Sequence, residues 1–363
     1  MDTLVIPVMR PRLPDADALL PYLRRIDANR WYSNFGPLGQ ELEIRLAEHW
    51  RVGPGCVLPL VNATLGLAVA LTACGAESGS LCLMPSWSFV ATAHAAGNAG
   101  LVPFFADVDA ASGALTPDIA AAAVDAAPGP VGAVMPVYPF GAPIDVAGWE
   151  RFRRRTGIPV VIDAAAAFDS LRPSELPQVV SLHATKVFPA GEGAVLVCPD
   201  ATMVAHARRR ANFGFLGNHQ SLVAATNAKM SEYHAAVALA SLDLWPATRA
   251  QWRRVLERLR AATAIPSIAW PAGLGRDYVC SSPALRVADA AATVNALRDA
   301  GVDSRQWWQG GIHSHPAFAT RPSLPLPVSE SLARTTVSIP CWLDMEARTI
   351  DLVAATLCRH AGG

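Results

Sequence analysis

The sequence predicts an α/β fold: a large domain built on a mostly parallel, doubly wound sheet of seven strands, followed by a smaller α+β lobe. From residue 57 to residue 198, short apolar runs alternate with longer alanine-rich segments of helical character, the pattern of β-α units around a parallel sheet. Beyond Pro246 the strands are shorter and several prolines occur. We therefore expect a large domain at residues 1–245, including an N-terminal arm, and a small C-terminal domain at residues 246–363.

Each predicted element follows from a local pattern. The apolar runs predict strands at residues 57–60, 81–84, 102–105, 133–137, 160–163, 179–182 and 194–198. Helices are predicted between them at residues 64–74, 88–96, 117–126 and 146–156, the last with Asp145 as its N-cap. Further helices are predicted at residues 202–211, 231–244, 248–262, 288–300 and 347–360, with a polar, glycine-containing loop at 212–227.

Composition excludes several classes of protein. The 363 residues are long enough for a large core, and 30 Lys plus Arg balance 30 Asp plus Glu, so the formal net charge is zero. No basic field is present to hold a phosphate polymer, and we expect no nucleic-acid partner. Only 17% of the residues are charged and 52% are hydrophobic, which indicates a large buried surface and favours an oligomer.

Cysteine usage and the apolar stretches favour a cytoplasmic protein. Seven cysteines are scattered without a C-x-x-C pair, which indicates reduced thiols rather than disulfides or a zinc site. The N-terminus is acidic before it is apolar and breaks at Pro7, so it does not resemble a signal peptide. Residues 52–76 and 78–106 carry no charged side chain, but glycine and proline interrupt both, so we expect buried core and no membrane contact.

The segment from Ser181 to Lys186 is the most informative one for chemistry. It stands between two predicted strands and beside the turn Gly191-Glu-Gly193. A loop lysine is usually a solvated side chain, but small and apolar neighbours would desolvate this amine, lower its pKa and make it nucleophilic toward carbonyls. The hydroxyls of Ser181 and Thr185 can bind a phosphate.

Asp163 ends the predicted strand 160–163. Ligands of open parallel sheets bind at the carboxyl ends of the strands, so this carboxylate is well placed for a ligand. It can cap the following turn, and it can also hold a ligand nitrogen protonated, which would make a heterocycle an electron sink.

Two other strand ends offer ligand contacts. At Asn62-Ala63-Thr64 a strand gives way to a helix, whose free backbone donors and dipole suit a phosphate, although Asn62 can equally serve as a cap. Trp87 follows another strand and can stack on a flat ring or pack in the core. His313 and His315 lack a third metal ligand, so we expect no metal site. The motifs of Rossmann dehydrogenases, α/β-hydrolases and P-loop ATPases are missing.

Taken together, the order phosphate loop, aromatic, Asp, Ser and Lys resembles the fold type I pyridoxal phosphate enzymes, and the local motifs resemble the DegT/DnrJ/StrS sugar aminotransferase family. The motifs that carry the resemblance are Ser33-Asn-Phe-Gly-Pro-Leu38, Asn62-Ala-Thr64, Pro85-Ser-Trp-Ser-Phe-Val-Ala-Thr92, Met135-Pro-Val-Tyr-Pro-Phe-Gly141, Asp163-Ala-Ala165, Ser181 to Lys186, Gly191-Glu-Gly193 and Asn227-Ala-Lys-Met-Ser-Glu232.

The resemblance implies roles for individual residues. Lys186 would join pyridoxal 5′-phosphate as an imine and later move the proton between the substrate carbon and the cofactor carbon. Asp163 would pair with the pyridine nitrogen. The other implied cofactor-binding residues are Ala63, Thr64 and Ser181 at the phosphate, Trp87 on the ring, and Asn227, which would reach the phosphate from the neighbouring subunit of a homodimer.

Two positions depart from the family pattern. Ala166 stands where the family usually has Gln or His and cannot hydrogen-bond to a cofactor oxygen, and Tyr138 stands where the family often has His. Lys186 itself is present, whereas the dehydratase branch has histidine there, and this favours amino transfer over deoxygenation.

The resemblance therefore implies amino transfer, with L-glutamate as the expected donor, to a nucleotide-linked keto-deoxysugar such as dTDP-4-keto-6-deoxyhexose. Two alternatives stay open: the same chemistry on a 3-keto sugar or a cyclitol ketone, and a cofactor-binding regulatory protein with little turnover.

Overall fold

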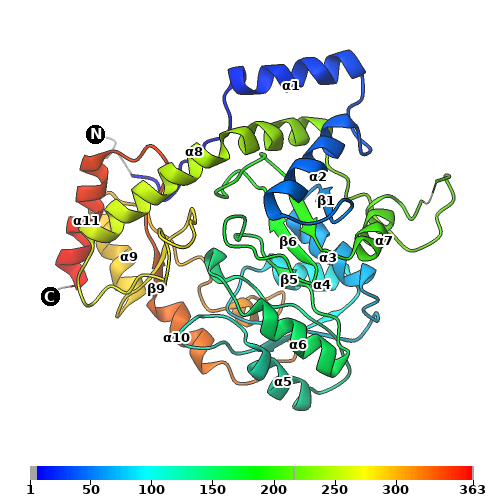
Figure 1. The fold of residues 1–363 in the computed structure, drawn as a ribbon. Helices are drawn as coiled ribbons and strands as arrows, with labels where there is room; N and C mark the ends of the chain where they lie inside the picture. The colour runs from blue at the N-terminus through cyan, green and yellow to red at the C-terminus, as the bar shows by residue number, and fades with distance from the viewer. Residues whose placement is uncertain (1–5, 216, 362–363) are drawn as a thin grey trace.

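The computed structural model describes residues 6–215 and 217–361 (Figure 1). Residues 1–5, 216 and 362–363 lie outside the described part, and with them the start of the N-terminal segment, one residue of the predicted loop 212–227 and the outer ends of both predicted domains. The strands of the large sheet are β1 (Val57–Leu60), β2 (Leu81–Pro85), β3 (Val102–Ala106), β4 (Val131–Val134), β5 (Ile162–Asp163), β6 (Gln178–Ser181) and β7 (Ala194–Val197). The predicted α/β class is confirmed.

These strands form two hydrogen-bonded groups, β3-β2-β4 and β1-β7-β6-β5. The two groups meet where the end of β4 and the chain after it lie beside the β5 segment. There Val134 pairs with Val160, and the Tyr138 amide donates to the Asp163 carbonyl at 3.0 Å. The strand order is thus β3-β2-β4-β5-β6-β7-β1. All neighbours pair in parallel except β7, which is antiparallel to both β6 and β1. The sheet is therefore mostly parallel, as predicted.

Both faces of the sheet are covered, because alternate residues of each strand point to opposite sides. In β2, Leu81 and Leu83 belong to one hydrophobic core while Cys82 and Met84 belong to the other. The second core is closed by α3 (Ala63–Ala73), α4 (Ala91–Asn98) and α7 (Ala201–Ala211). The first is closed by α2 (Pro37–Trp50), α5 (Pro117–Asp125), α6 (Val146–Thr156) and α8 (Glu232–Ala262).

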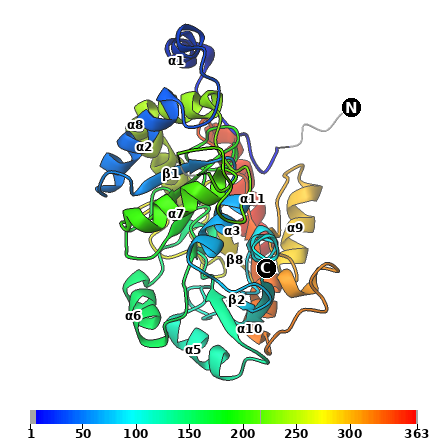
Figure 2. The ribbon, with the colours of Figure 1, turned by 90° about the vertical axis from the view of Figure 1, so that its right-hand side faces the viewer.

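The remaining elements flank this sheet. The helix α1 (Ala16–Asn29) packs against α8 at one end of the molecule, whereas α5 and α6 lie at the opposite end in both views (Figures 1 and 2). A small two-stranded sheet pairs β8 (Ala284–Arg286) with β9 (Thr336–Ser338). Around it lie α9 (Ala290–Asp299), α10 (Pro327–Thr335) and α11 (Ala347–Ala361), with short 3-10 turns at Pro139–Gly141 and Ile312–Ser314. In the described part of the chain, no helix has the length and apolar character to cross a membrane.

The two helices predicted at residues 231–244 and 248–262 are one helix, α8, which continues through Pro246. Proline lacks an N–H, so the Leu242 carbonyl loses its intrahelical partner there. The buried side chains on both sides of the proline, Trp245 and Trp252, favour continuation because a break would expose them. The boundary proposed after residue 245 falls inside α8, so this helix would be shared by both domains.

The start of α2 is held by a residue far away in the sequence. Gly36 at the N-cap position has no side chain to accept the first N–H groups of the helix. Glu232, which is 2% exposed, accepts instead from the amides of Leu38 at 2.7 Å and Gly39 at 2.8 Å. One carboxylate thereby joins the starts of α2 and α8.

We expect Glu232→Ala to lower the free energy of unfolding by about 3 kcal/mol, because the buried Leu38 amide and the partly buried Gly39 amide lose a charged acceptor. Urea unfolding followed by circular dichroism measures this loss. Glu257→Ala, at an exposed position of the same helix, is the control and changes stability by less than about 0.5 kcal/mol. Equal stability of the Glu232 variant and the control would contradict the capping role.

Candidate active site

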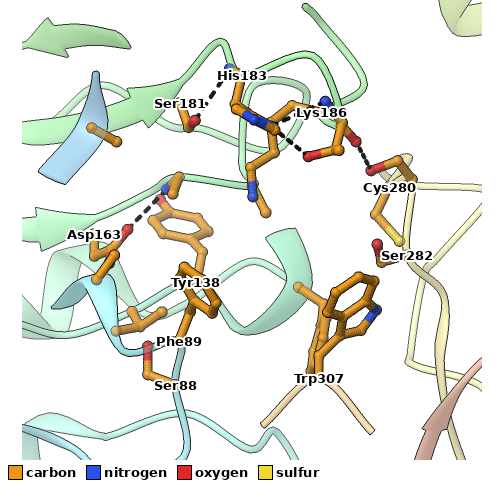
Figure 3. A pocket seen from close by; sticks show the side chains of 18 of the residues that line it. Ser88, Phe89, Tyr138, Asp163, Ser181, His183, Lys186, Cys280, Ser282 and Trp307 are labelled. Carbon is orange, nitrogen blue, oxygen red and sulfur yellow. Dashed lines mark hydrogen bonds between the residues drawn. The ribbon is translucent and has the colours of Figure 1, made fainter. Parts of the chain in front are cut away.

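A cavity of about 440 Å³ lies where β1, β5 and β6 end (Figure 3). Five of the residues singled out in the sequence line it together: Ala63, Thr64, Asp163, Ser181 and Lys186. Lys186 comes from the loop between β6 and β7, and the other four stand at or just after strand ends. The prediction that these segments meet at the carboxyl edge of the sheet agrees with this placement.

Asp163 is a buried carboxylate, 5% exposed, at the end of β5. Thr92 donates its hydroxyl to Oδ2 at 2.8 Å, and the Ala165 amide donates to Oδ1 at 3.1 Å. Because the Thr92 proton points to the carboxylate, Ser88 is the donor in its 2.9 Å contact with Thr92. Desolvation raises the pKa of Asp163, while these hydrogen bonds and the charge of Lys186 oppose the rise. Both direct donors are neutral, so neither of them supplies a positive charge to balance the carboxylate.

The environment of Lys186 matches that of a reactive amine. Desolvation lowers the pKa of the Lys186 ammonium, and the charge of Asp163 partly opposes this shift. Cys280, which lies between α8 and β8, lines the same cavity, and burial raises the pKa of its thiol to about 12, so it is protonated at neutral pH. The loop is fixed on both sides, since the Lys186 amide donates to the His183 carbonyl at 2.9 Å and Ser281 donates its hydroxyl to the Thr185 carbonyl at 2.7 Å.

One end of the cavity can bind an anion. Ala63 and Thr64 open α3, and the first N–H groups of a helix have no partner within it. Asn62 caps this helix, accepting from the Leu65 amide at 2.9 Å, so the capping alternative is correct for its side chain. The Ser181 hydroxyl lies at the same edge of the sheet. Backbone donors, a helix dipole and a hydroxyl together suit a phosphate group.

Trp87 does not line the cavity, and the prediction that it stacks on a cofactor ring is wrong in placement. Its side chain is 4% exposed and packs edge-on against Trp308, with ring centroids 5.2 Å apart. Phe89, two residues further along the same loop, lines the cavity instead and is 55% exposed. The aromatic side chain that this loop offers to a flat ligand is therefore Phe89.

The two positions that depart from the family pattern also line the cavity. The Tyr138 hydroxyl is turned away from a ligand role, because it donates to Oε1 of Gln178 at 3.1 Å, and burial raises its pKa to about 12. Ala166 offers only a methyl group. Neither side chain supplies a polar contact comparable to the one that Gln or His would make.

The comparison with known families agrees with this geometry. Residues 15–358 match the family described as the DegT/DnrJ/EryC1/StrS aminotransferase family. The chain belongs to this family. It is therefore an aminotransferase, and the predicted resemblance is confirmed.

Individual relatives cover much of this aminotransferase. It is 34% identical over 252 residues, 65% of its own length and 64% of the other, to the dTDP-4-amino-4,6-dideoxy-D-glucose transaminase of Shigella dysenteriae. It is 32% identical to DesI, solved with its TDP-sugar product, with a TM-score of 0.87 over 100% of this chain and 94% of that one. A Bacillus cereus structure described as a PLP-dependent aminotransferase is 25% identical, with a TM-score of 0.90 over 97% and 99% of the two chains.

The cofactor of this aminotransferase is pyridoxal phosphate, and the cavity fits it. Ala63, Thr64 and Ser181 can hold the phosphate, Lys186 can reach the aldehyde, and Asp163 lines the cavity, where it can face a pyridine nitrogen. When bound, pyridoxal phosphate supplies the electron sink that lets a C–H bond beside an amine break.

Asn227 lies apart from this cavity. It is exposed, does not line the cavity of its own chain and pairs with Asn212 across the loop that joins α7 to α8. Its predicted contact with the phosphate therefore depends on a second subunit.

Proposed function

We propose that this aminotransferase moves an amino group from L-glutamate to the keto group of a nucleotide-linked deoxysugar, with a dTDP-4-keto-6-deoxyhexose as the first candidate. The observation that carries the proposal is a cavity that joins a desolvated lysine, a buried carboxylate and a phosphate cradle. The similarity to a dTDP-sugar transaminase and to DesI with its TDP-sugar product supports the substrate class.

In this proposal, each residue of the cavity has one task. Asp163 keeps the pyridine nitrogen protonated, and Thr92 with Ser88 keeps the Asp163 carboxylate oriented. Lys186 accepts the proton from the amine-bearing carbon and returns it as the general acid, for which a lowered pKa suits neutral pH. Phe89 supplies the apolar face that holds the ring.

Two measurements separate the proposal from its alternatives. Glutamate alone should release one 2-oxoglutarate per cofactor, and a mass-spectrometric screen of nucleotide-linked 4-keto and 3-keto sugars and cyclitol ketones should then find the aminated product. If only a 3-keto sugar or a cyclitol ketone is aminated, that compound would replace the 4-keto sugar as the proposed acceptor. No 2-oxoglutarate release would favour the regulatory protein with little turnover.

The proposal includes a homodimer in which Asn227 of each chain binds the cofactor phosphate of the other. Exposed aromatic side chains near the start of α2 and α8 fit a buried interface, among them Trp31, Tyr32 and Tyr233. All seven cysteines are free, which supports the reducing cytoplasm as the place of action.

We expect Asn227→Ala to weaken cofactor retention and Lys186→Ala to be inactive, yet a mixture of the two should regain activity. Random exchange of subunits gives half heterodimers with one intact site of two, or about a quarter of wild-type activity. Activity is measured after refolding the variants together. Separate refolding before mixing is the control, and no recovery after joint refolding would contradict shared sites.

A further inference from the structure

The small lobe contributes a second wall to the active-site cavity. Residues that fit the cofactor lie between residues 62 and 186, whereas Cys280, Ser281, Ser282, Trp307 and Trp308 line the cavity from the other lobe. Figure 3 shows Trp307 and Ser282 on one side and Asp163, Tyr138 and Phe89 on the other, with Lys186 directed between them. The second wall is thus left for the substrate.

Trp307, which lines this wall, leaves part of its indole uncovered. The side chain is 37% exposed, although its neighbour Trp308 is 9% exposed. Trp308 stacks on Phe140 with centroids 3.9 Å apart and rings inclined by 20°. An apolar surface of this size at a cavity is a typical place for a ligand ring to pack.

The loop that carries Trp307 is fixed in place. His313 Nδ1 lies 2.7 Å from the Ser86 hydroxyl, and the Ile312 amide donates to the Ser86 carbonyl at 2.8 Å. Gly311 has φ of +73°, and a Cβ there would lie 2.8 Å from the Ser86 hydroxyl oxygen, so the turn requires glycine. These contacts anchor the loop beside Ser86 just after Trp307, which limits how far the indole can move.

The wall around Trp307 offers few charged side chains that could bind a substrate. Among the described residues that line the cavity, the basic side chains are those of Lys186 and His183. His183 faces Glu192, with Nε2 3.7 Å from a carboxylate oxygen. The Trp307 side of the cavity therefore offers contact with the apolar face of a substrate ring.

We propose that Trp307 is a specificity-determining residue whose indole packs against the ring of the acceptor sugar. This inference rests on the proposed function, because it assumes that a sugar ring is the acceptor. The donor reaction with glutamate involves no such ring, so Trp307 acts on one half of the catalytic cycle only. The indole stabilises the bound acceptor and the transition state equally, and therefore Trp307 affects KM rather than kcat.

The test compares Trp307→Ala, Trp307→Phe and Gln309→Ala in the cofactor-loaded enzyme. Gln309 is an exposed neighbour on the same loop that does not line the cavity. Losing roughly 60–100 Å² of apolar contact should raise KM for the nucleotide-linked keto-deoxysugar about 10- to 70-fold in Trp307→Ala. Trp307→Phe keeps a flat apolar face and should stay near wild type, as should Gln309→Ala. Release of 2-oxoglutarate from glutamate should be unchanged in all three.

The outcomes separate this inference from the proposed function. An unchanged acceptor KM in Trp307→Ala, or an equal loss of the glutamate half-reaction, would overturn the role of Trp307 while leaving the sugar acceptor in place. If no keto sugar is aminated, calorimetric titration of the wild-type enzyme with a dTDP-linked 4-amino-6-deoxyhexose tests binding directly. If the wild-type enzyme neither binds this compound nor aminates any keto sugar, both the acceptor class and the role of Trp307 are wrong.

Discussion

Lys186→Ala is expected to lower kcat/KM at least about 10³-fold, because the variant loses the amine that reaches the cofactor aldehyde and moves the proton. The fold should be retained, since the side chain lines a cavity and its backbone amide keeps the bond to the His183 carbonyl. Transamination rate and circular dichroism, measured on the same preparation, check both halves of this expectation.

A conservative variant and a labelling experiment serve as controls. Lys186→Arg keeps a positive charge but is not nucleophilic, so it should be as inactive as the alanine variant. The chain has only two lysines, and Lys229 holds its ammonium 4.3 Å from the centre of the Phe213 ring. Borohydride reduction followed by peptide mapping should therefore label Lys186 and spare Lys229. Wild-type turnover in Lys186→Ala, or a label on Lys229, would contradict the assignment.

Local sequence patterns predicted most elements whose causes are local, although α1 was missed despite its cap Asp15, which accepts from the Ala18 amide at 3.0 Å. All seven predicted strands exist, and α6 begins after Asp145, whose carboxylate accepts from the Gly148 amide at 2.9 Å. Apolar alternation and a capping residue operate within a few positions of the element they define. The strand bounds differ by up to three residues, as in β4, which begins at Val131 and ends at Val134 rather than spanning residues 133–137.

Elements stabilised by distant residues were not predicted. The helix α2 has no capping side chain at Gly36, and its partner Glu232 lies nearly 200 positions away. At α10, the amides of Val328 and Ser329 bond to Asp107 at 2.8 and 2.7 Å. In both cases the capping side chain belongs to another segment, and the local start signal is only the proline at the first helical position, Pro37 or Pro327.

In the candidate site, too, residues with a local sequence signal were predicted and residues placed by distant contacts were not. Asp163 was predicted from its place at a strand end, Lys186 from its desolvating neighbours, and Ser181, Ala63 and Thr64 from a hydroxyl and a helix start that suit a phosphate. The structure brings these five residues to one cavity. That Phe89 rather than Trp87 lines the cavity was not predictable, because the cluster that buries Trp87 includes Trp308, which is distant in the sequence. Cys280 was missed as a cavity residue, because it lies far from the predicted strand ends in the sequence.

Asp163→Asn should lower kcat/KM by about 10²- to 10³-fold, the size expected when one preorganised charge is removed from an active site. An amide is nearly isosteric with the carboxylate but does not hold a pyridine nitrogen protonated. The negative charge of Asp163 also raises the pKa of Lys186, so the Lys186 pKa should fall further in the variant. Steady-state kinetics measure the first effect, and the pH dependence of cofactor uptake by the cofactor-free protein measures the second, with uptake beginning at lower pH.

Stability distinguishes a chemical role for Asp163 from a structural one. Desolvation raises the pKa of this carboxylate, so its charged form is disfavoured by the fold, and Asp163→Asn should not lower the unfolding free energy of the cofactor-free protein near pH 7. Asp299→Asn, at an exposed site on α9, is the matched control and should leave both kcat/KM and stability unchanged. A variant that unfolds more easily but keeps wild-type kcat/KM would mean that Asp163 supports the fold rather than the reaction.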